Sequence, residues 1–352
     1  MRLAIASDAW TPQVNGVVRT LTETISRMRS RGHQIELLTP DRFVNIPCPG
    51  YSEIRLAVAP RFNVRRILGT FQPDIVHIST EGPIGWSARA WCLKHDVPFT
   101  TAFHTRFPEY VAARTPLSAD LIWPIMRKFH KHSKAVLAAT QSLRNELESR
   151  GIENTKLWSR GIDRDMFHPE QPEHPRLKHL AKPVMLSVGR IAVEKNLEAF
   201  LDADVPGTKV VVGDGPARAA LEARYPSVLF LGTRSGAELA SIYATADVFV
   251  FPSKTDTFGL VIVEALACGL PVAGFPVQGP LDIIGADGRG PNGSMNRAVG
   301  SLNLDLAQAI QAALLLNRSE ASQYGAGFCW DACTDQFESG IVQAETHNAL
   351  AA

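Results

Sequence analysis

Short apolar runs alternate along the chain with longer segments that contain both apolar and polar residues. The runs 3–7, 34–38 and 184–188 are rich in apolar side chains, a composition typical of buried strands. Segments such as 18–31 and 235–246 are long enough for helices. This repeated order of strand and helix predicts an α/β fold in which parallel sheets are doubly wound, with helices on both faces.

A proline-rich segment interrupts this alternation near the middle of the chain. Residues 169–183 hold four prolines and charges of both signs, which is typical of a linker between domains. We therefore predict a first domain over 1–168, a linker over 169–182 and a second domain over 183–328. The segment 329–352 is expected to form the last helix.

The stretch 247–272 combines a strand, a polar loop and a glycine turn that opens a helix. The strand over 248–251 ends at Pro252, because proline cannot donate to a sheet ladder. After the polar loop, the helix is expected to open with the residues Phe258, Gly259, Leu260 and Val261. A helix that begins after such a turn presents free backbone N–H groups, which together with the helix dipole can bind phosphate.

Two acidic residues in this stretch lie where both could contact the same ligand. Glu264 lies about a turn and a half inside the expected helix, where its carboxylate can accept hydrogen bonds from ribose hydroxyls. Asp256 precedes it by eight positions, in the polar loop. The alternative is that both are solvated acids on an ordinary strand-helix unit.

Cations and glycines occupy two other loops that follow strands. Arg190 and Lys195 follow the strand 184–188, and two cations on one diphosphate would offset its charge as it departs, without a metal. A surface ion-pair loop is the alternative. At the first strand-to-helix junction, the amides of Gly16 and Val17 are placed to face phosphate.

His104 follows the strand 98–102, and ligands of open α/β sheets bind at the carboxyl ends of strands. Its imidazole can donate a hydrogen bond to a sugar hydroxyl or to a developing charge, although a satisfied loop histidine is the alternative. Nearby Arg106 can pair with an anionic sugar, with a lipid phosphate or with Glu109.

Charge is unevenly divided along a chain whose net charge is +1. Residues 1–165 hold 23 Lys and Arg against 15 Asp and Glu, whereas 166–352 hold 13 against 20. Within the first half, the segment 121–136 combines apolar residues including Trp123 with the basic residues Arg127, Lys128, Lys131 and Lys134. This composition predicts contact with an anionic membrane surface. The alternatives are a core-facing helix with a solvated basic face, and attraction between the two domains.

Composition excludes several other classes. Hydrophobic residues make up 45% of the chain and charged residues 20%, and no apolar run reaches the roughly 18 residues of a membrane span. The five scattered cysteines form no C-x-x-C pair, which favours a reducing cytoplasm over a disulfide framework or a zinc site. The basic residues lack the aromatic platform and recognition-helix motif of nucleic-acid binders.

Several motifs in chain order resemble those of retaining GT-B glycosyltransferases of family four. The D-x7-E pattern from Asp256 to Glu264 resembles the family's E-x7-E motif, with an acid one methylene shorter at the first position. The G-R-x4-K pattern ending at Lys195 resembles its diphosphate-binding loop. The H-T-R-F-P-E-Y segment from His104 resembles the branch that contains diacylglycerol glycosyltransferases and lipid mannosyltransferases.

This resemblance implies two facing Rossmann-like domains, a donor cleft between them and a last helix that crosses back to the first domain. It implies that His104 and Asp256 contact the donor sugar, and that the loop of Gly16 and Val17 closes over the diphosphate. The implied reaction transfers a sugar with retention at the anomeric carbon, with the leaving diphosphate helping to deprotonate the acceptor. No cofactor or metal is expected.

The combined prediction is a cytoplasmic enzyme, peripheral on the inner face of the membrane, that glycosylates a lipid such as diacylglycerol. A UDP-sugar, glucuronic acid or glucose, is the favoured donor. The alternatives are a GDP-mannose-dependent α-mannosyltransferase and a sugar-nucleotide epimerase of the same fold.

Overall fold

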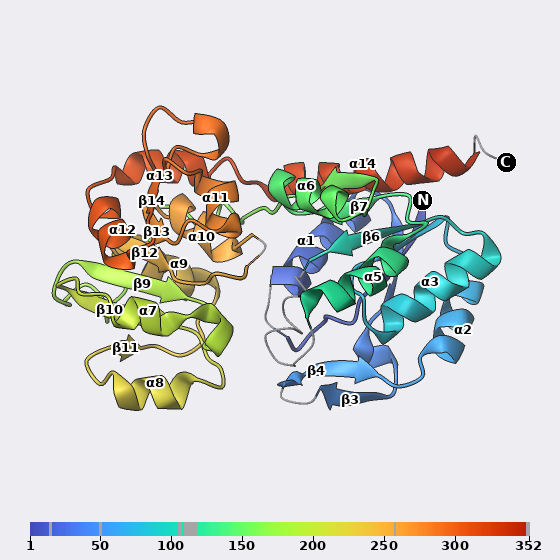
Figure 1. Cartoon of the computed structure of the whole chain (residues 1–352), viewed down its shortest axis with the longest axis horizontal. Coiled ribbons are helices and arrows are strands. Elements are labelled where there is room, and N and C mark those ends of the chain that lie inside the picture. The colour runs from blue at the N-terminus through green and yellow to red at the C-terminus, as the bar shows by residue number, and fades with distance from the viewer. Residues whose placement is uncertain (14–15, 49–50, 105–107, 109–117, 257, 350–352) are drawn as a thin grey trace. The chain divides into compact units, whose positions relative to one another are not determined.

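The computed structural model describes residues 1–13, 16–48, 51–104, 108, 118–256 and 258–349. The chain divides into two compact units (Figure 1). Unit 1 consists of Met1–Arg160 with Trp330–Ala352, and unit 2 consists of Gly161–Cys329.

Unit 1 is built on a parallel sheet with the strand order β2-β1-β5-β6-β7-β8. The strands in that order are Gln34–Leu38, Arg2–Ala6, Ile75–Ile78, Phe99–Phe103, Val136–Ala138 and Thr155–Leu157. Its helices include α1 (Gly16–Ser30), α2 (Arg61–Phe71), α3 (Pro83–His95), α5 (Ala119–His130), α6 (Gln141–Ser149) and α14 (Trp330–Ala349). A short helix η1 (Pro40–Arg42) and an antiparallel pair, β3 (Asn45–Cys48) and β4 (Tyr51–Ala57), precede α2.

Unit 2 has a second parallel sheet, with the order β11-β10-β9-β12-β13-β14. These strands are Leu229–Phe230, Thr208–Val212, Val184–Val188, Val248–Phe251, Val272–Gly274 and Gly300–Leu302. Its α-helices include α7 (Leu197–Leu201), α8 (Arg218–Arg224), α9 (Gly236–Thr245), α10 (Leu260–Ala267), α11 (Gln278–Ile284), α12 (Leu306–Ala313) and α13 (Arg318–Gly325). The short helices are η2 (Val193–Lys195) and η3 (Pro291–Gly293). The predicted α/β architecture with two doubly wound sheets is confirmed.

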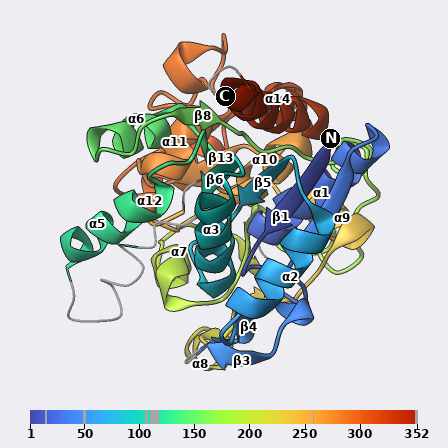
Figure 2. The ribbon, with the colours of Figure 1, turned by 90° about the vertical axis from the view of Figure 1, so that its right-hand side faces the viewer.

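The central strands are apolar along their whole length because both faces of each sheet are covered. In β5, Val76 and Ile78 belong to a buried cluster with residues of α2 and α3, which lie side by side (Figure 2). His77 points the other way, since successive side chains of a strand face opposite sides of the sheet. Its ring centroid lies 4.9 Å from that of Phe337 on α14.

Each sheet reverses its strand order at one point, and this is where loops can leave room for a ligand. In unit 1 the reversal lies between β1 and β5, and in unit 2 it lies between β9 and β12. Because all the strands are parallel, the loops that follow β9 and β12 leave the same edge of the sheet as neighbours. The fold therefore brings 189–196 close to 252–259.

Acidification is expected to destabilise unit 1 through His77. Burial lowers the pKa of His77 from 6.5 to about 3. Between these pH values the unfolded chain holds a proton that the folded chain does not, so the free energy of unfolding falls as pH falls. The slope is up to about 1.4 kcal/mol per pH unit.

Urea titrations between pH 7 and pH 4 test this expectation on His77→Phe, which keeps a buried ring but cannot take up the proton. In this variant, the free energy of unfolding should depend less steeply on pH than in the parent, by up to about 1.4 kcal/mol per pH unit. His95→Gln, at an exposed histidine, should leave the slope unchanged. Equal slopes in the parent and His77→Phe would contradict the assignment.

Because α10 packs closely against α13, a methyl group added at Gly325 is expected to lower the free energy of unfolding. A Cβ at Gly325 would lie 2.2 Å from the backbone nitrogen of Ala267. We expect Gly325→Ala to lower the free energy of unfolding by about 1–3 kcal/mol, as overpacking does. At the helical position Gly69, where a Cβ meets nothing within 4 Å, Gly69→Ala should be neutral or stabilising. Thermal unfolding midpoints that shift equally in the two variants would refute this account.

Candidate active site

In unit 2, the loops after β9 and β12 are joined by side-chain contacts at the point where the strand order reverses. Lys195 Nζ lies 2.5 Å from Asp256 Oδ1. Next to it, Asn196 Nδ2 donates to the carbonyl oxygen of Pro252 at 3.1 Å. These contacts bring together Lys195 and Asp256, two predicted site residues that lie 61 positions apart.

This ion pair remains accessible to solvent. The side chains of Lys195 and Asp256 are 28% and 24% exposed. Arg190, at the start of the same loop, is half-buried. An anion that reaches Lys195 can therefore compete with Asp256 for the ammonium group, so the pair is able to exchange partners when a ligand binds.

The helix α10 begins as the sequence predicts, directly after a glycine. Gly259 has φ 100°, a left-handed conformation that favours glycine, and a Cβ there would meet Ile262 Cδ1 at 3.0 Å. Leu260 and Val261 form the first turn, in which backbone N–H groups lack helical partners. Phe258 is buried, with its ring 6.3 Å from that of Phe328. This helix start is suited to bind a phosphate group.

Glu264 is buried inside α10, with an exposed fraction of 2%. Its Oε2 accepts a hydrogen bond from the hydroxyl group of Tyr243 at 3.1 Å. Tyr243 lies on α9. Its contact with Glu264 was not predicted from the sequence, because no motif includes Tyr243. The predicted contact of Glu264 with ribose stays a prediction.

A second residue missed at the sequence level is Gly279, at the start of α11. A Cβ at this position would lie 2.9 Å from the carbonyl oxygen of Phe258 and 3.0 Å from that of Asp256. The absence of a side chain lets α11 approach the backbone of Asp256 and of Phe258.

In unit 1, Asp8 organises the loops at the reversal of strand order. It follows β1, and its carboxylate accepts from the backbone N–H groups of Ile84 and Gly85 at 2.9 and 3.2 Å, at the start of α3. Burial raises the pKa of Asp8 to about 6, although these hydrogen bonds lower it. The helix α1 begins at Gly16, two residues before the predicted start at residue 18, so the amides of Gly16 and Val17 lie in its first turn.

His104 lies directly after β6, at the carboxyl edge of the unit 1 sheet. It is buried, and its Nδ1 lies 2.9 Å from Nη2 of Arg160. Burial, followed by the charge of Arg160 and by His77, holds the pKa of His104 well below 6.5. The imidazole is therefore neutral at physiological pH. Arg106 and Glu109 lie outside the described residues.

The predicted basic residues in and just after α5 are exposed, but the aromatic residue of α5 is not. Arg127, Lys128, Lys131 and Lys134 are all exposed. Trp123 is buried with an exposed fraction of 2%, as expected for the alternative of a core-facing helix with a solvated basic face. The ring stacks on Phe103 in the core of unit 1. Leu121 and Ile125 instead supply the exposed apolar side chains of α5, at 65% and 50%.

The described part of the chain includes no helix with the length and apolar character needed to cross a membrane.

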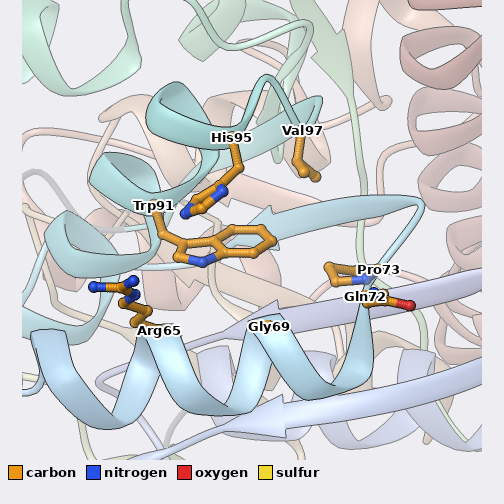
Figure 3. Close-up of a pocket in the computed structure, with 7 residues that line it drawn as sticks. All are labelled: Arg65, Gly69, Gln72, Pro73, Trp91, His95 and Val97. Carbon is orange, nitrogen blue, oxygen red and sulfur yellow. The ribbon is translucent and has the colours of Figure 1, made fainter.

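A hollow of about 430 Å³ lies between the carboxyl ends of α2 and α3 (Figure 3). It is lined by Arg65, Gly69, Gln72, Pro73, Trp91, His95 and Val97. These residues precede β5 and β6, so the hollow lies at the amino edge of the sheet, away from His104.

Both halves of the chain match models of glycosyltransferase families. Residues 14–166 match "Glycosyltransferase Family 4", and residues 182–315 match "Glycosyl transferases group 1". Among solved structures, sucrose-phosphate synthase from Thermosynechococcus elongatus superposes with a TM-score of 0.70 and 22% identity, covering 96% of this chain and 97% of that one. The fold is therefore the GT-B fold.

Curated relatives cover most of the chain. A GDP-mannose-dependent alpha-mannosyltransferase from Mycobacterium tuberculosis is 31% identical over 308 residues, 81% of each chain. Sulfoquinovosyl transferase SQD2 from Arabidopsis thaliana is 31% identical over 80% of this chain and 60% of its own. Alpha-monoglucosyldiacylglycerol synthase from Streptococcus pneumoniae is 27% identical, covering 77% and 70%.

These matches define a nucleotide-sugar-dependent glycosyltransferase with a GT-B fold. The chain belongs to glycosyltransferase family 4, a retaining family, and is related to lipid-modifying members. The resemblance predicted from the sequence motifs is confirmed at this level.

Loss of the Lys195 charge is expected to weaken donor binding selectively. We expect Lys195→Ala to raise the dissociation constant of a nucleoside diphosphate at least tenfold, because one charge-assisted contact with phosphate is lost. The stability of the fold should change by less than about 1 kcal/mol, since the pair with Asp256 is partly exposed. Isothermal titration calorimetry and thermal unfolding measure the two quantities.

Lys182→Ala is the matched control for this experiment. Lys182 Nζ lies 3.0 Å from an oxygen of Asp247 in the same unit, so its removal deletes an equivalent ion pair outside the 189–196 loop. Nucleotide affinity should be unchanged in this variant. Equal losses of affinity in both variants would show that Lys195 has no direct role in binding.

Proposed function

We propose that the protein transfers mannose from GDP-mannose to a diacylglycerol-based lipid, with retention of the anomeric configuration. The observation that carries the donor is the similarity to a GDP-mannose-dependent alpha-mannosyltransferase over 81% of both chains. The sequence motifs alone favour a UDP-sugar, and this similarity favours GDP-mannose, the alternative, instead. The acceptor is proposed from the lipid named in the diacylglycerol synthase relative.

In this proposal the donor diphosphate binds at the β9/β12 edge of unit 2. Arg190 and Lys195 neutralise its charge, and the first turn of α10 donates backbone hydrogen bonds. The backbone from Phe258 to Val261 forms this turn, and Gly259 gives it the required conformation. Glu264 binds the ribose hydroxyls after its hydrogen bond with Tyr243 rearranges.

The Lys195–Asp256 contact suggests how donor binding prepares the chemistry. When the diphosphate takes Lys195, the carboxylate of Asp256 is released from its partner at 2.5 Å and becomes available to the sugar. The leaving diphosphate oxygen then takes the acceptor proton while Arg190 and Lys195 stabilise the developing charge. The incoming oxygen attacks the face that the diphosphate leaves, which retains the configuration. In unit 1, the amides of Gly16 and Val17 are proposed to contact the same diphosphate.

A diacylglycerol-based acceptor lies in a membrane, so the proposed reaction requires the enzyme to reach a bilayer. We place the membrane contact on α5, where the exposed apolar side chains of Leu121 and Ile125 lie beside the basic residues of the same helix. The protein is thus a peripheral enzyme of the cytoplasmic face of the membrane, attracted by anionic lipids.

A second candidate function is transfer of a different hexose to the same class of lipid. The sulfoquinovosyl and glucosyl transferases among the relatives favour it. The epimerase alternative predicts conversion of the nucleotide sugar without any acceptor.

The defining experiment supplies diacylglycerol in anionic mixed micelles with GDP-mannose, UDP-glucose, UDP-glucuronic acid or UDP-galactose, and identifies lipid products by mass spectrometry. We expect a mannolipid from GDP-mannose, with the α-anomer seen by NMR. A glycolipid from a UDP-sugar alone would establish the second candidate. Sugar-nucleotide conversion in the absence of lipid would establish the epimerase.

Neutralising the basic residues of the α5 region should abolish membrane association. We expect a variant with Arg127, Lys128, Lys131 and Lys134 all changed to Gln to lose on the order of a thousandfold in binding to vesicles with 30 mol% anionic lipid, taking roughly 1 kcal/mol for each charge near the surface and about 1.4 kcal/mol per tenfold. Vesicle co-sedimentation measures the loss.

The control for this variant removes four exposed charges elsewhere, at Lys156, Arg164, Arg176 and Lys178. Its vesicle binding should remain close to that of the parent protein. If both variants lose binding equally, net charge governs association and α5 has no special role.

A further inference from the structure

The contact between Arg160 and His104 determines which ring nitrogen of His104 carries the proton. Nη2 of Arg160 lies 2.9 Å from Nδ1 of His104. A guanidinium group has donors and no acceptor, so Nδ1 must be the acceptor in this hydrogen bond. A neutral imidazole that accepts at Nδ1 carries its proton at Nε2.

We propose that Arg160 is a positioning residue that fixes His104 as the Nε2–H tautomer and so makes His104 a hydrogen-bond donor to a substrate oxygen. This inference rests on the proposed function for the identity of the substrate, a sugar hydroxyl or a phosphate oxygen of the nucleotide sugar. It also excludes a general-base role, because the lone pair of Nδ1 is engaged and Nε2 is protonated.

Arg160 is itself held in place by the backbone around it. Its Nη1 donates to the carbonyl oxygens of Trp158 and Ser159 at 2.7 and 3.0 Å. The guanidinium carbon lies 5.2 Å from the centroid of the Trp158 ring. Arg160 is 7% exposed and Trp158 is fully buried. The donor that contacts His104 is therefore fixed by two carbonyl groups and one aromatic ring.

Trp158 fixes the orientation of the imidazole from a second side. Its ring centroid lies 5.2 Å from that of His104, at an interplanar angle of 60°. The same indole lies 4.8 Å from the ring of Phe337 on α14. Since a hydrogen bond and an edge contact restrain one ring together, His104 has a defined tautomer and a defined direction for its Nε2–H bond.

Among the described residues, Arg160 and His77 both lower the pKa of His104, and Cys333 interacts with Arg160. Arg160 is cationic, and burial lowers its pKa to about 10, which keeps it protonated at neutral pH. His77 on β5 is neutral, with its pKa lowered to about 3 by burial. Burial raises the pKa of Cys333, on α14 near Arg160, to about 11, so the thiol is also neutral. His104 therefore stays a neutral donor across the physiological range.

The direct test is a two-dimensional NMR spectrum of the protein labelled with ¹⁵N in the histidine rings. The signals of His104 are identified by their loss in His104→Asn. We expect a protonated Nε2 and an unprotonated Nδ1 that stay unchanged from pH 8 to pH 6. A protonated Nδ1, or a ring that titrates near pH 6.5, would overturn the proposal without any assay of activity.

The second test follows the variants Arg160→Met and Arg160→Lys. In Arg160→Met we expect mixed tautomers for His104 and at least a tenfold fall in kcat, because the hydrogen bond from Nε2–H to the substrate is lost in part of the molecules. The pKa of His104 should rise but stay below 6.5, because burial, the larger cause of its lowering, remains. Arg160→Lys retains a cationic donor and should restore part of the tautomer preference and of kcat.

These outcomes separate a positioning role from a merely structural one. If Arg160→Met lowers the thermal midpoint but leaves the tautomer and the pH profile of the folded protein unchanged, Arg160 does not act through His104. If the NMR result stands but no donor gives product, the proposed function fails and the tautomer assignment remains.

Discussion

The parallel arrangement of strands is the constraint on which the candidate site depends. Parallel pairing sends the loops after β9 and β12 out of the same edge, and the reversal of strand order makes these loops neighbours. Lys195 and Asp256 meet there, although each lies on a separate strand-helix unit. The same reversal in unit 1 joins Asp8 to the start of α3.

The charged side chains at these sheet edges are paired with a neighbouring side chain. A ligand can replace the partner in one pair and bind to the other pair as it stands. Asp256 holds Lys195 in a partly exposed pair, whereas Arg160 and His104 form a buried pair with the imidazole neutral. The first arrangement suits a cation that must meet a diphosphate, because its partner can be exchanged. The second suits a fixed donor, because burial and the guanidinium both disfavour a second proton on the ring.

Much of the fold was predictable from the sequence, since β5, β9 and β12 are apolar runs bounded by turn residues. The β3–β4 pair was not, because Pro47 and polar residues obscure its alternation. Motif spacing predicted Lys195 and Asp256 as site residues, and their contact follows from strand order, which spacing does not encode. The burial of Trp123 could not be predicted, because an amphipathic helix has the same pattern whether its apolar face meets the core or a bilayer.

A crystal structure of the protein with bound GDP-mannose tests the central claim most directly. The account predicts the diphosphate at the β9/β12 edge of unit 2, with a phosphate oxygen about 3 Å from Lys195 Nζ and the contact between Lys195 and Asp256 broken. It further predicts the first turn of α10 against the same diphosphate. A nucleotide bound elsewhere, or bound with the Lys195–Asp256 pair intact, would contradict the account.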